Sequence, residues 1–153
     1  MQWRSDSPEA TEQWARQLAA RLQPGDVITL EAPLGGGKTT LVRGLAQGLG
    51  IAEEAVSSPT FVLWQIYEGR LRLHHFDAYR LHSASELEEL GFDECLQGRD
   101  VVVVEWPEVA RDYLPPDRLE ISLSYGEDPD QRILELRPLG NWIERIKDFE
   151  YGR

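Results

Sequence analysis

The hydrophobic positions of the chain change their period several times, which predicts alternating helices and strands. At residues 38–49 the apolar side chains Leu41, Leu45 and Leu49 recur every fourth position, so they share one face of an expected helix. Apolar and small side chains follow the same spacing at residues 8–22. Helices are expected at residues 8–22, 38–49, 85–90 (with Ser85 as the N-cap) and 140–149.

Short runs of β-branched and aromatic residues between these segments predict strands. The four consecutive valines at 101–104 indicate a strand buried on both faces, as in the centre of a parallel sheet. Residues 119–125 alternate instead, so every second side chain, Tyr125 included, is expected to face inward. The order α-β-α-β-β-α-β-α-β-β-α predicts a mixed α/β sheet. Strands are expected at residues 27–30, 61–67, 71–76, 101–104, 119–125 and 132–137, the last two as an antiparallel pair.

A glycine-rich loop between an expected strand and an expected helix carries the strongest candidate chemistry. Residues 32–39 read Ala-Pro-Leu-Gly-Gly-Gly-Lys-Thr and fit the pattern G-x-x-x-x-G-K-[ST], with Ala32 in place of the first glycine. In such a loop the backbone N–H groups, here those of Gly35, Gly36 and Gly37, bind phosphate oxygens. The positive end of the following helix adds to this attraction, so the pattern predicts a nucleotide site.

The three residues that follow the glycines have separate expected roles. Lys38 is expected to reach the β- and γ-phosphates, Thr39 to bind Mg²⁺ through its hydroxyl, and Thr40 to reach the α-phosphate region. Together with the strand and helix order, the loop predicts a single P-loop NTPase-like domain over residues 1–153. Its expected fold is α/β, a mixed sheet with a parallel core and antiparallel strands, flanked by helices.

A P-loop site also needs a carboxylate near Mg²⁺ and a group that places the attacking water. Glu105 ends the valine strand and is the first candidate; Asp77 ends the 71–76 strand and is the second. Thr60 lies after the P-loop helix, where NTPases often place a switch threonine. The alternatives are solvated acids at strand ends and an ordinary Ser-Pro turn before a strand.

Composition and charge narrow the possible partners. The 153 residues carry 16 basic and 27 acidic side chains, a net charge of −11, and the segment 81–130 accounts for the excess. That balance argues against broad binding of nucleic acid, which depends on Lys and Arg. No apolar run is long enough to span a bilayer, no signal-peptide pattern is seen, and one cysteine cannot form an internal disulfide. A cytoplasmic location without membrane contact is expected.

Four motifs occur in order along the chain. They are residues 32–40, Ser58-Pro59-Thr60-Phe61, His75-Phe76-Asp77-Ala78-Tyr79-Arg80-Leu81 and Val103-Val104-Glu105-Trp106-Pro107-Glu108. Together they make the chain similar to a known family, the bacterial TsaE (YjeE) family of small P-loop ATPases. The resemblance covers nearly the whole chain, and the closing helix from about residue 139 is its least covered part.

The resemblance implies a function in tRNA modification. The family supports transfer of a threonylcarbamoyl group to N6 of the adenosine beside the anticodon, in tRNAs that read codons beginning with A. It implies that the chain binds ATP or ADP with Mg²⁺ and acts on a complex of the partner proteins TsaB and TsaD.

The resemblance also implies roles for single residues, matched motif by motif. Glu105 corresponds to the glutamate near Mg²⁺, and Asp77 to an essential second carboxylate that could also reach Mg²⁺ or order water. Thr60 corresponds to the switch threonine and Trp106 to the tryptophan beside the site, while Arg132 aligns with a residue near the base.

The loop departs from the family pattern, which usually reads Gly-Asp-Leu-Gly-Ala-Gly-Lys-Thr-Thr. Ala32 and Pro33 replace the first two residues, and Gly36 stands where alanine is usual. Because proline lacks an N–H and fixes φ, this change bears on nucleotide affinity and on any role of the missing aspartate.

Two other functions remain open from the residues alone: a small-molecule kinase, and a nucleotide-gated binding module with negligible hydrolysis. A zinc site is not expected, because His74 and His75 are neighbours on a strand and point to opposite faces. Cys95 is expected to be a small packing residue, and Arg80 could reach the phosphates as an arginine from the same chain.

Overall fold

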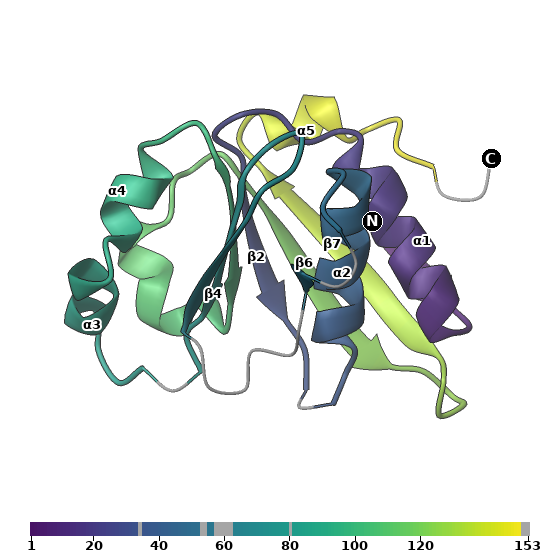
Figure 1. Cartoon of the computed structure of the whole chain (residues 1–153). Coiled ribbons are helices and arrows are strands. Elements are labelled where there is room, and N and C mark those ends of the chain that lie inside the picture. Colours follow the sequence, from purple (N-terminus) through teal and green to yellow (C-terminus); the bar gives the residue numbers. More distant parts are fainter. Residues whose placement is uncertain (34, 53–54, 57–62, 80, 151–153) are drawn as a thin grey trace.

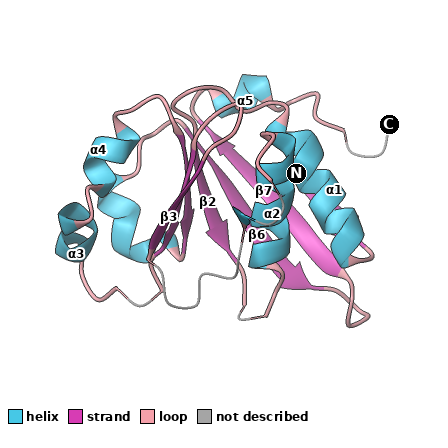
Figure 2. Ribbon diagram, in the orientation of Figure 1, coloured by secondary structure: helices cyan, strands magenta, loops and turns pink. Residues whose placement is uncertain are grey.

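The computed structural model describes residues 1–33, 35–52, 55–56, 63–79 and 81–150, and its strands form one seven-stranded sheet (Figures 1 and 2). The sheet order is β1-β7-β6-β2-β5-β4-β3. The central strands β6, β2, β5 and β4 are parallel, and the pairs β1–β7, β6–β7 and β3–β4 are antiparallel. This confirms the mixed α/β sheet with a parallel core. The strands are β1 Gln2–Ser5, β2 Val27–Glu31, β3 Trp64–Tyr67, β4 Leu73–Asp77, β5 Val101–Glu105, β6 Arg118–Tyr125 and β7 Arg132–Leu139.

Helices cover both faces of the sheet, as Figure 1 shows. On one face α1 and α2 lie side by side; on the other, α3, α4 and the 3-10 helix η2 pack over β4 and β5. The short helix α5 follows β7 and returns toward the first face. The helices are α1 Pro8–Ala19, α2 Lys38–Gly48, α3 Ala84–Glu89, α4 Phe92–Leu96, η2 Pro107–Tyr113 and α5 Trp142–Arg145.

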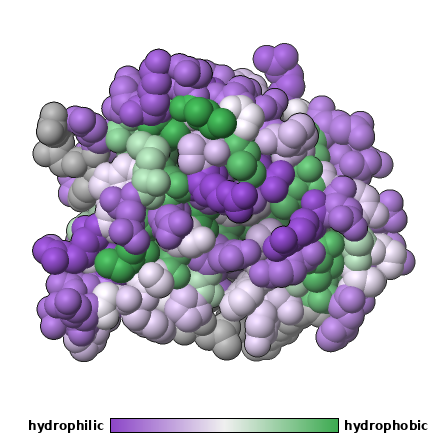
Figure 3. Space-filling model, turned by 180° about the vertical axis from the view of Figure 1, so that it is seen from behind, coloured by the Kyte–Doolittle hydropathy of each residue, from purple (hydrophilic) through white to green (hydrophobic). Residues whose placement is uncertain are grey.

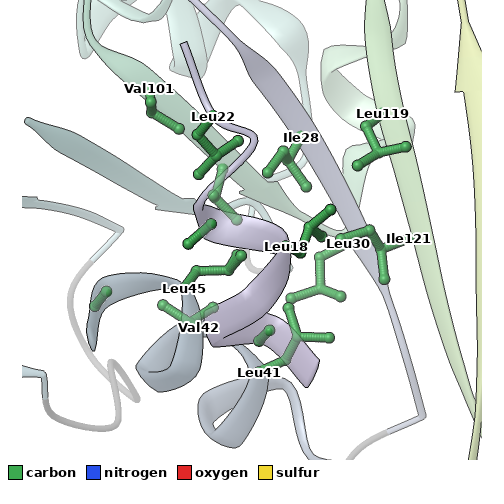
Figure 4. Packing of buried hydrophobic residues seen from close by; sticks show 14 of the residues in the cluster. Leu18, Leu22, Ile28, Leu30, Leu41, Val42, Leu45, Val101, Leu119 and Ile121 are labelled. Atoms are coloured by element: carbon green, nitrogen blue, oxygen red, sulfur yellow. The ribbon is translucent and has the colours of Figure 1, made fainter. Parts of the chain in front are cut away.

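The larger hydrophobic core lies between the α1–α2 layer and the sheet. Leu18 from α1 and Leu41 and Leu45 from α2 are fully buried against Ile28 and Leu30 of β2 (Figure 4). The valines of β5 alternate between this core and the second one beneath α3, α4 and η2, so all four are buried. The interpretation of residues 101–104 as a strand buried on both faces is therefore confirmed.

Helices α1 and α2 cross closely because α2 presents two glycines to α1. A methyl group at Gly44 would lie 2.7 Å from the Cβ of Ala15, and one at Gly48 would lie 2.7 Å from the carbonyl oxygen of Arg16. Real Cβ atoms do not approach that closely, so the contact requires glycine at both positions. This packing fixes α2, and with it the residues at its first turn.

Strand β1 and the true end of α5 were not predicted from the sequence pattern. In β1, Trp3 alone supplies a large apolar side chain, which packs edge-on against Trp14 and Phe149 at 5.7 Å between ring centroids. The expected helix at residues 140–149 is short, since α5 ends at Arg145, whose guanidinium binds Asp26 at 2.7 Å. In both cases tertiary contacts outweigh the local pattern.

Two detailed expectations were wrong. Ser83, not Ser85, precedes the helix α3, and Ser85 lies in its first turn, where its hydroxyl contacts that of Ser83 at 2.9 Å. Tyr125 ends β6 and is 53% exposed rather than buried, because its ring supports the Arg132 guanidinium at the sheet edge. Residues 61 and 62 of the expected strand at 61–67 lie outside the described residues. None of the described helices has the length and apolar character needed to cross a membrane.

Candidate functional site

The glycine-rich loop leaves the carboxyl end of β2 and enters α2 through two glycines in the left-handed region. Gly35 has φ 75° and Gly37 has φ 102°, conformations that other residues adopt at a cost. The turn closes where the N–H of Gly36 donates to the carbonyl oxygen of Pro33 at 2.8 Å. Residues 35–39 line a hollow of about 260 Å³ at the start of α2. The loop therefore has an open, amide-lined side.

Pro33 and Gly36 depend on each other sterically. A methyl group at Gly36 would lie 2.7 Å from the carbonyl oxygen of Pro33 and 3.1 Å from its ring carbons. The proline and the extra glycine, two of the three departures from the family pattern, thus meet at one turn. With Pro33 in this conformation, alanine at position 36 has no room.

The Lys38 ammonium lies over an aromatic side chain beside the loop. Its Nζ is 4.1 Å from the centre of the Trp106 ring, within the range of a cation–π contact. Trp106 follows β5 and has φ 57°. Among the described residues, it is the one residue other than glycine with a positive φ. The Tyr79 ring packs at 5.0 Å from the Trp106 ring. This strained tryptophan therefore lies beside Lys38, and it lines a separate hollow of about 300 Å³ together with Ala32 and Pro33 at the start of the loop.

Two carboxylates end neighbouring parallel strands at the same sheet edge as the loop. Asp77 on β4 and Glu105 on β5 are register partners, so their side chains lie side by side on one face. The backbone N–H of Tyr79 donates to Asp77 Oδ1 at 3.1 Å. Glu105 is buried, with a side chain 4% exposed. The structure thus brings together the two acids that the sequence selected.

Burial raises the pKa of the Asp77 carboxyl above its usual value. The nearby Glu105 carboxylate raises this pKa further, while the Tyr79 N–H and the positive charge of Lys38 oppose the rise. Burial and then the charge of Glu105 also raise the pKa of the Tyr67 phenol. These directions show that Glu105 projects negative charge into a poorly solvated space.

Arg132 approaches the loop from the start of β7. Its Nε donates to the carbonyl oxygen of Gly36 at 2.9 Å, and its guanidinium carbon lies 4.7 Å from the centre of the Tyr125 ring. Beside it is a second hollow of about 150 Å³, between the loop, α2 and the start of α1. This hollow is lined by Pro8, Thr11, Gly35, Gly37, Thr40, Asp130 and Arg132.

Thr11 and Asp130 in this hollow were not selected from the sequence. The Thr11 hydroxyl lies 2.6 Å from that of Ser5, so β1 positions the start of α1 against the loop. No local pattern distinguishes a threonine in the first turns of a helix from any other, and β1 itself was not predicted. Only the paired strands β1 and β7 bring these residues beside Gly37.

Several candidates lie elsewhere or outside the described residues. Thr60 and Arg80 are outside them. His74 faces away from the loop, where its Nε2 lies 2.7 Å from Asp100 and its Nδ1 lies 3.7 Å from the Cys95 sulfur. Within the described residues, no group of three or more His, Cys, Asp or Glu side chains could hold a metal ion.

Another hollow, of about 400 Å³, lies away from the candidate chemistry. It lies over the face of β6 and β7 that α1 and α2 leave uncovered, and it holds Arg111, Arg118, Glu120, Glu135 and Arg137 among others. Seen from behind, the molecule carries hydrophilic side chains over much of this side (Figure 3). Because Glu120 pairs with both Arg118 and Arg137, this is a solvated charged surface.

Comparison with known proteins gives a consistent result. The family model "Threonylcarbamoyl adenosine biosynthesis protein TsaE" matches residues 5–134. The chain is 42% identical over 147 residues to the tRNA threonylcarbamoyladenosine biosynthesis protein TsaE of Bacillus subtilis, covering 95% of this chain and 90% of the relative. A protein of the same name from Treponema pallidum is 42% identical over 129 residues, 84% of this chain and 95% of the relative.

A solved structure is also similar. The crystal structure of Bacillus subtilis YdiB superimposes with a TM-score of 0.80 and 35% identity, and the match covers 97% of this chain and 92% of that one. The likeness therefore extends over the sheet, the loop and both helical layers.

Proposed function

The chain belongs to the TsaE family, and from that premise we propose that it is a Mg²⁺-dependent ATPase of tRNA modification. In this proposal it assists a TsaB–TsaD complex in placing threonylcarbamoyl on N6 of the adenosine beside the anticodon, in tRNAs that read codons beginning with A. One observation supports the ATPase role above others. The glycine loop with Lys38 opens at the same sheet edge as the paired carboxylates Asp77 and Glu105.

ATP would bind with its phosphates in the hollow of residues 35–39. The N–H groups of Gly35, Gly36 and Gly37 and the start of α2 supply positive charge toward the phosphate oxygens. Lys38 would leave the Trp106 ring to neutralise the β- and γ-phosphates, since a salt bridge to phosphate is stronger than a cation–π contact.

The hollow beside Arg132 is suited to the base and ribose of the nucleotide. It adjoins the phosphate hollow through Gly35 and Gly37, and it offers the Thr11 and Thr40 hydroxyls and the Asp130 carboxylate as hydrogen-bonding groups. Arg132 fixes the loop from this side through the Gly36 carbonyl.

The side chains at the site fit Mg²⁺, a hard cation that takes oxygen ligands. Thr39 offers a hydroxyl, and Glu105 and Asp77 offer carboxylates at one edge of the sheet. Two carboxylates and a hydroxyl leave room for phosphate oxygens and water, as is usual for Mg²⁺ with a nucleotide. When bound, Mg²⁺ would supply charge neutralisation at the β- and γ-phosphates.

Hydrolysis requires a water placed in line with the γ-phosphorus; its oxygen forms the new P–O bond as the bond to ADP breaks. Asp77, held by the Tyr79 N–H, would orient that water and accept its proton, a role helped by its raised pKa. The carboxylate of Glu105 would bind Mg²⁺. An arginine that reaches the γ-phosphate speeds hydrolysis in many NTPases. Arg132 instead contacts the Gly36 carbonyl and the Tyr125 ring, so we expect slow turnover by the isolated chain and faster turnover with partners.

The acidic balance shapes how a tRNA-modification role would operate. The excess negative charge lies in residues 81–130 and disfavours broad contact with tRNA phosphates. Partner proteins, not this chain, would then hold the tRNA.

The direct test is to measure ATP binding by calorimetry and to identify the products of hydrolysis. We expect Mg²⁺-dependent binding and release of ADP and inorganic phosphate, both lost in Lys38→Ala and strongly reduced in Glu105→Ala. A phosphorylated small molecule instead of free phosphate would favour a kinase. Tight binding without any hydrolysis, even with TsaB and TsaD, would favour a nucleotide-gated module.

A further inference from the structure

His75 is a buried histidine whose ring nitrogens are unused within the part of the chain that the structure describes. Its side chain is 2% exposed, and neither Nδ1 nor Nε2 has a hydrogen-bond partner among the described residues. Leaving buried polar atoms unpaired costs free energy, so a native structure rarely keeps them without a reason. Its neighbour His74, on the opposite face of β4, pairs with both Trp64 and Asp100.

The His75 ring lies beside the carboxylate that ends the next strand. His75 Nε2 lies 3.5 Å from Glu105 Oε1, too far and too poorly aligned for a full hydrogen bond. Both side chains are at most 4% exposed and lie on the α2 side of the sheet, as does Asp77 two residues along β4. His75 therefore lies beneath the site, against the inner side of Glu105.

Gln65 lies across from His75 on the edge strand β3. Its side-chain oxygen is engaged by the Tyr67 hydroxyl. Two carboxylates of the described residues lie on the same face as His75, that of Glu105 on β5 and that of Asp77 two residues along β4. The imidazole makes its close contact with Glu105, at 3.5 Å, so Glu105 is the group on which His75 can act.

We propose that His75 is the positioning residue of Glu105, donating its Nε2–H to Oε1 and so fixing the carboxylate toward the nucleotide and its cation. This inference rests on the proposed function, because Glu105 needs a fixed direction only if it serves a metal–nucleotide site. Catalytic hydrogen bonds are often long in ligand-free structures and shorten in the complex. Carboxylates that hold metals are themselves held by hydrogen bonds, and loss of that support typically weakens metal affinity about 10–100-fold.

Three substitutions separate positioning from packing. His75→Leu replaces the imidazole by an apolar side chain of similar size and so removes the hydrogen-bond donor. His75→Gln places an amide N–H near the position of Nε2 and keeps the donor, while His75→Asn places it near Nδ1, away from Glu105.

The experiment is a calorimetric titration of ATP at a series of Mg²⁺ concentrations, and again in EDTA, with thermal unfolding of each variant. Mg²⁺ raises the affinity for ATP, and the measured quantity is the Mg²⁺ concentration at which half of that rise is reached. For His75→Leu and His75→Asn we expect this concentration to increase about 10–100-fold. We expect His75→Gln to stay near wild type, ATP affinity in EDTA to stay unchanged, and the melting temperature of His75→Leu not to fall.

Several results would overturn the inference. These are an unchanged Mg²⁺ dependence in His75→Leu, equal losses in the Gln and Asn variants, or an equal loss of affinity in EDTA. If His75→Leu does not fold, the comparison of Gln with Asn decides alone. The proposed function fails separately, if ATP binding to the wild-type chain does not depend on Mg²⁺. That result would be seen before any variant is made.

Discussion

The close contact between α1 and α2 gives a sharp prediction about the stability of the molecule. Gly44 lies in the middle of α2, where α2 crosses α1. A methyl group at Gly44 would lie 2.7 Å from Ala15 Cβ, 3.0 Å from the carbonyl carbon of Glu12, and closer still to the Glu12 oxygen. The obstacle is backbone, so no side-chain rotation can make room, and in Gly44→Ala the two helices must separate.

Two opposing effects set the magnitude. Replacing glycine by alanine within a helix stabilises the helix by about 1 kcal/mol. Overpacking of a tight contact costs about 1–3 kcal/mol, and contact with backbone belongs at the upper end of that range. The expected net loss is about 2 kcal/mol. For a chain of this size, about 2–4 °C of melting temperature corresponds to each kcal/mol, so a fall of about 4–8 °C is expected.

Thermal unfolding followed by circular dichroism measures this change. The matched control is Gly98→Ala, since a methyl group at Gly98 would meet nothing closer than 3.4 Å. That control is expected to leave the melting temperature unchanged or slightly raised. If Gly44→Ala melts at or above the wild-type temperature, the close helix contact does not exist as described. Because α2 begins with Lys38, a shifted helix should also weaken ATP binding.

Two further changes test the site itself. In Asp77→Asn we expect loss of hydrolysis but a higher melting temperature at pH 7 in EDTA. The native pKa of Asp77 is raised, so the stability linked to its protonated form is complete below the ordinary value of 3.8 and is lost as pH rises through the native pKa. The advantage of the variant over wild type should therefore shrink as pH falls toward about 4, and a constant gap across that range would contradict the assignment. In Arg132→Ala, loss of the hydrogen bond to Gly36 should weaken ATP binding about tenfold, roughly 1.4 kcal/mol, without changing the Mg²⁺ dependence; unchanged affinity by calorimetry would show that Arg132 does not support the loop.

Much of the fold follows from local patterns that the sequence displays directly. The valine run of β5 and the leucine spacing of α2 are strong sequence signals, because burial requires apolar side chains on both faces of β5 and on one face of α2. The loop between β2 and α2 is equally clear, since its glycines and lysine have a fixed spacing. Together with β4, which was also predicted as a strand, these elements place Lys38, Asp77 and Glu105 at one edge of the sheet.

The remaining features depend on contacts between distant segments. Strand β1 exists because Trp3 packs on Trp14 and Phe149, and nothing in its four residues shows this in advance. The second hollow needs β1 and β7 to bring Thr11 beside Arg132. Such pairings are visible only once the sheet order is known.

The unpaired state of His75 likewise has no sequence signature. A histidine on a strand reads the same whether its ring is satisfied, as in His74, or held without a partner beside a carboxylate. The distinction comes from the register of β4 with β5, which places His75 and Glu105 on the same buried face.

The most direct test of the account is reconstitution of tRNA modification. A TsaB–TsaD complex, tRNA and a threonylcarbamoyl donor are supplied with ATP, Mg²⁺ and either the wild-type chain or Lys38→Ala, and modified adenosine is measured over time. The account predicts formation of modified adenosine with the wild-type chain and a strongly reduced yield with Lys38→Ala. Equal yields with both chains would contradict it.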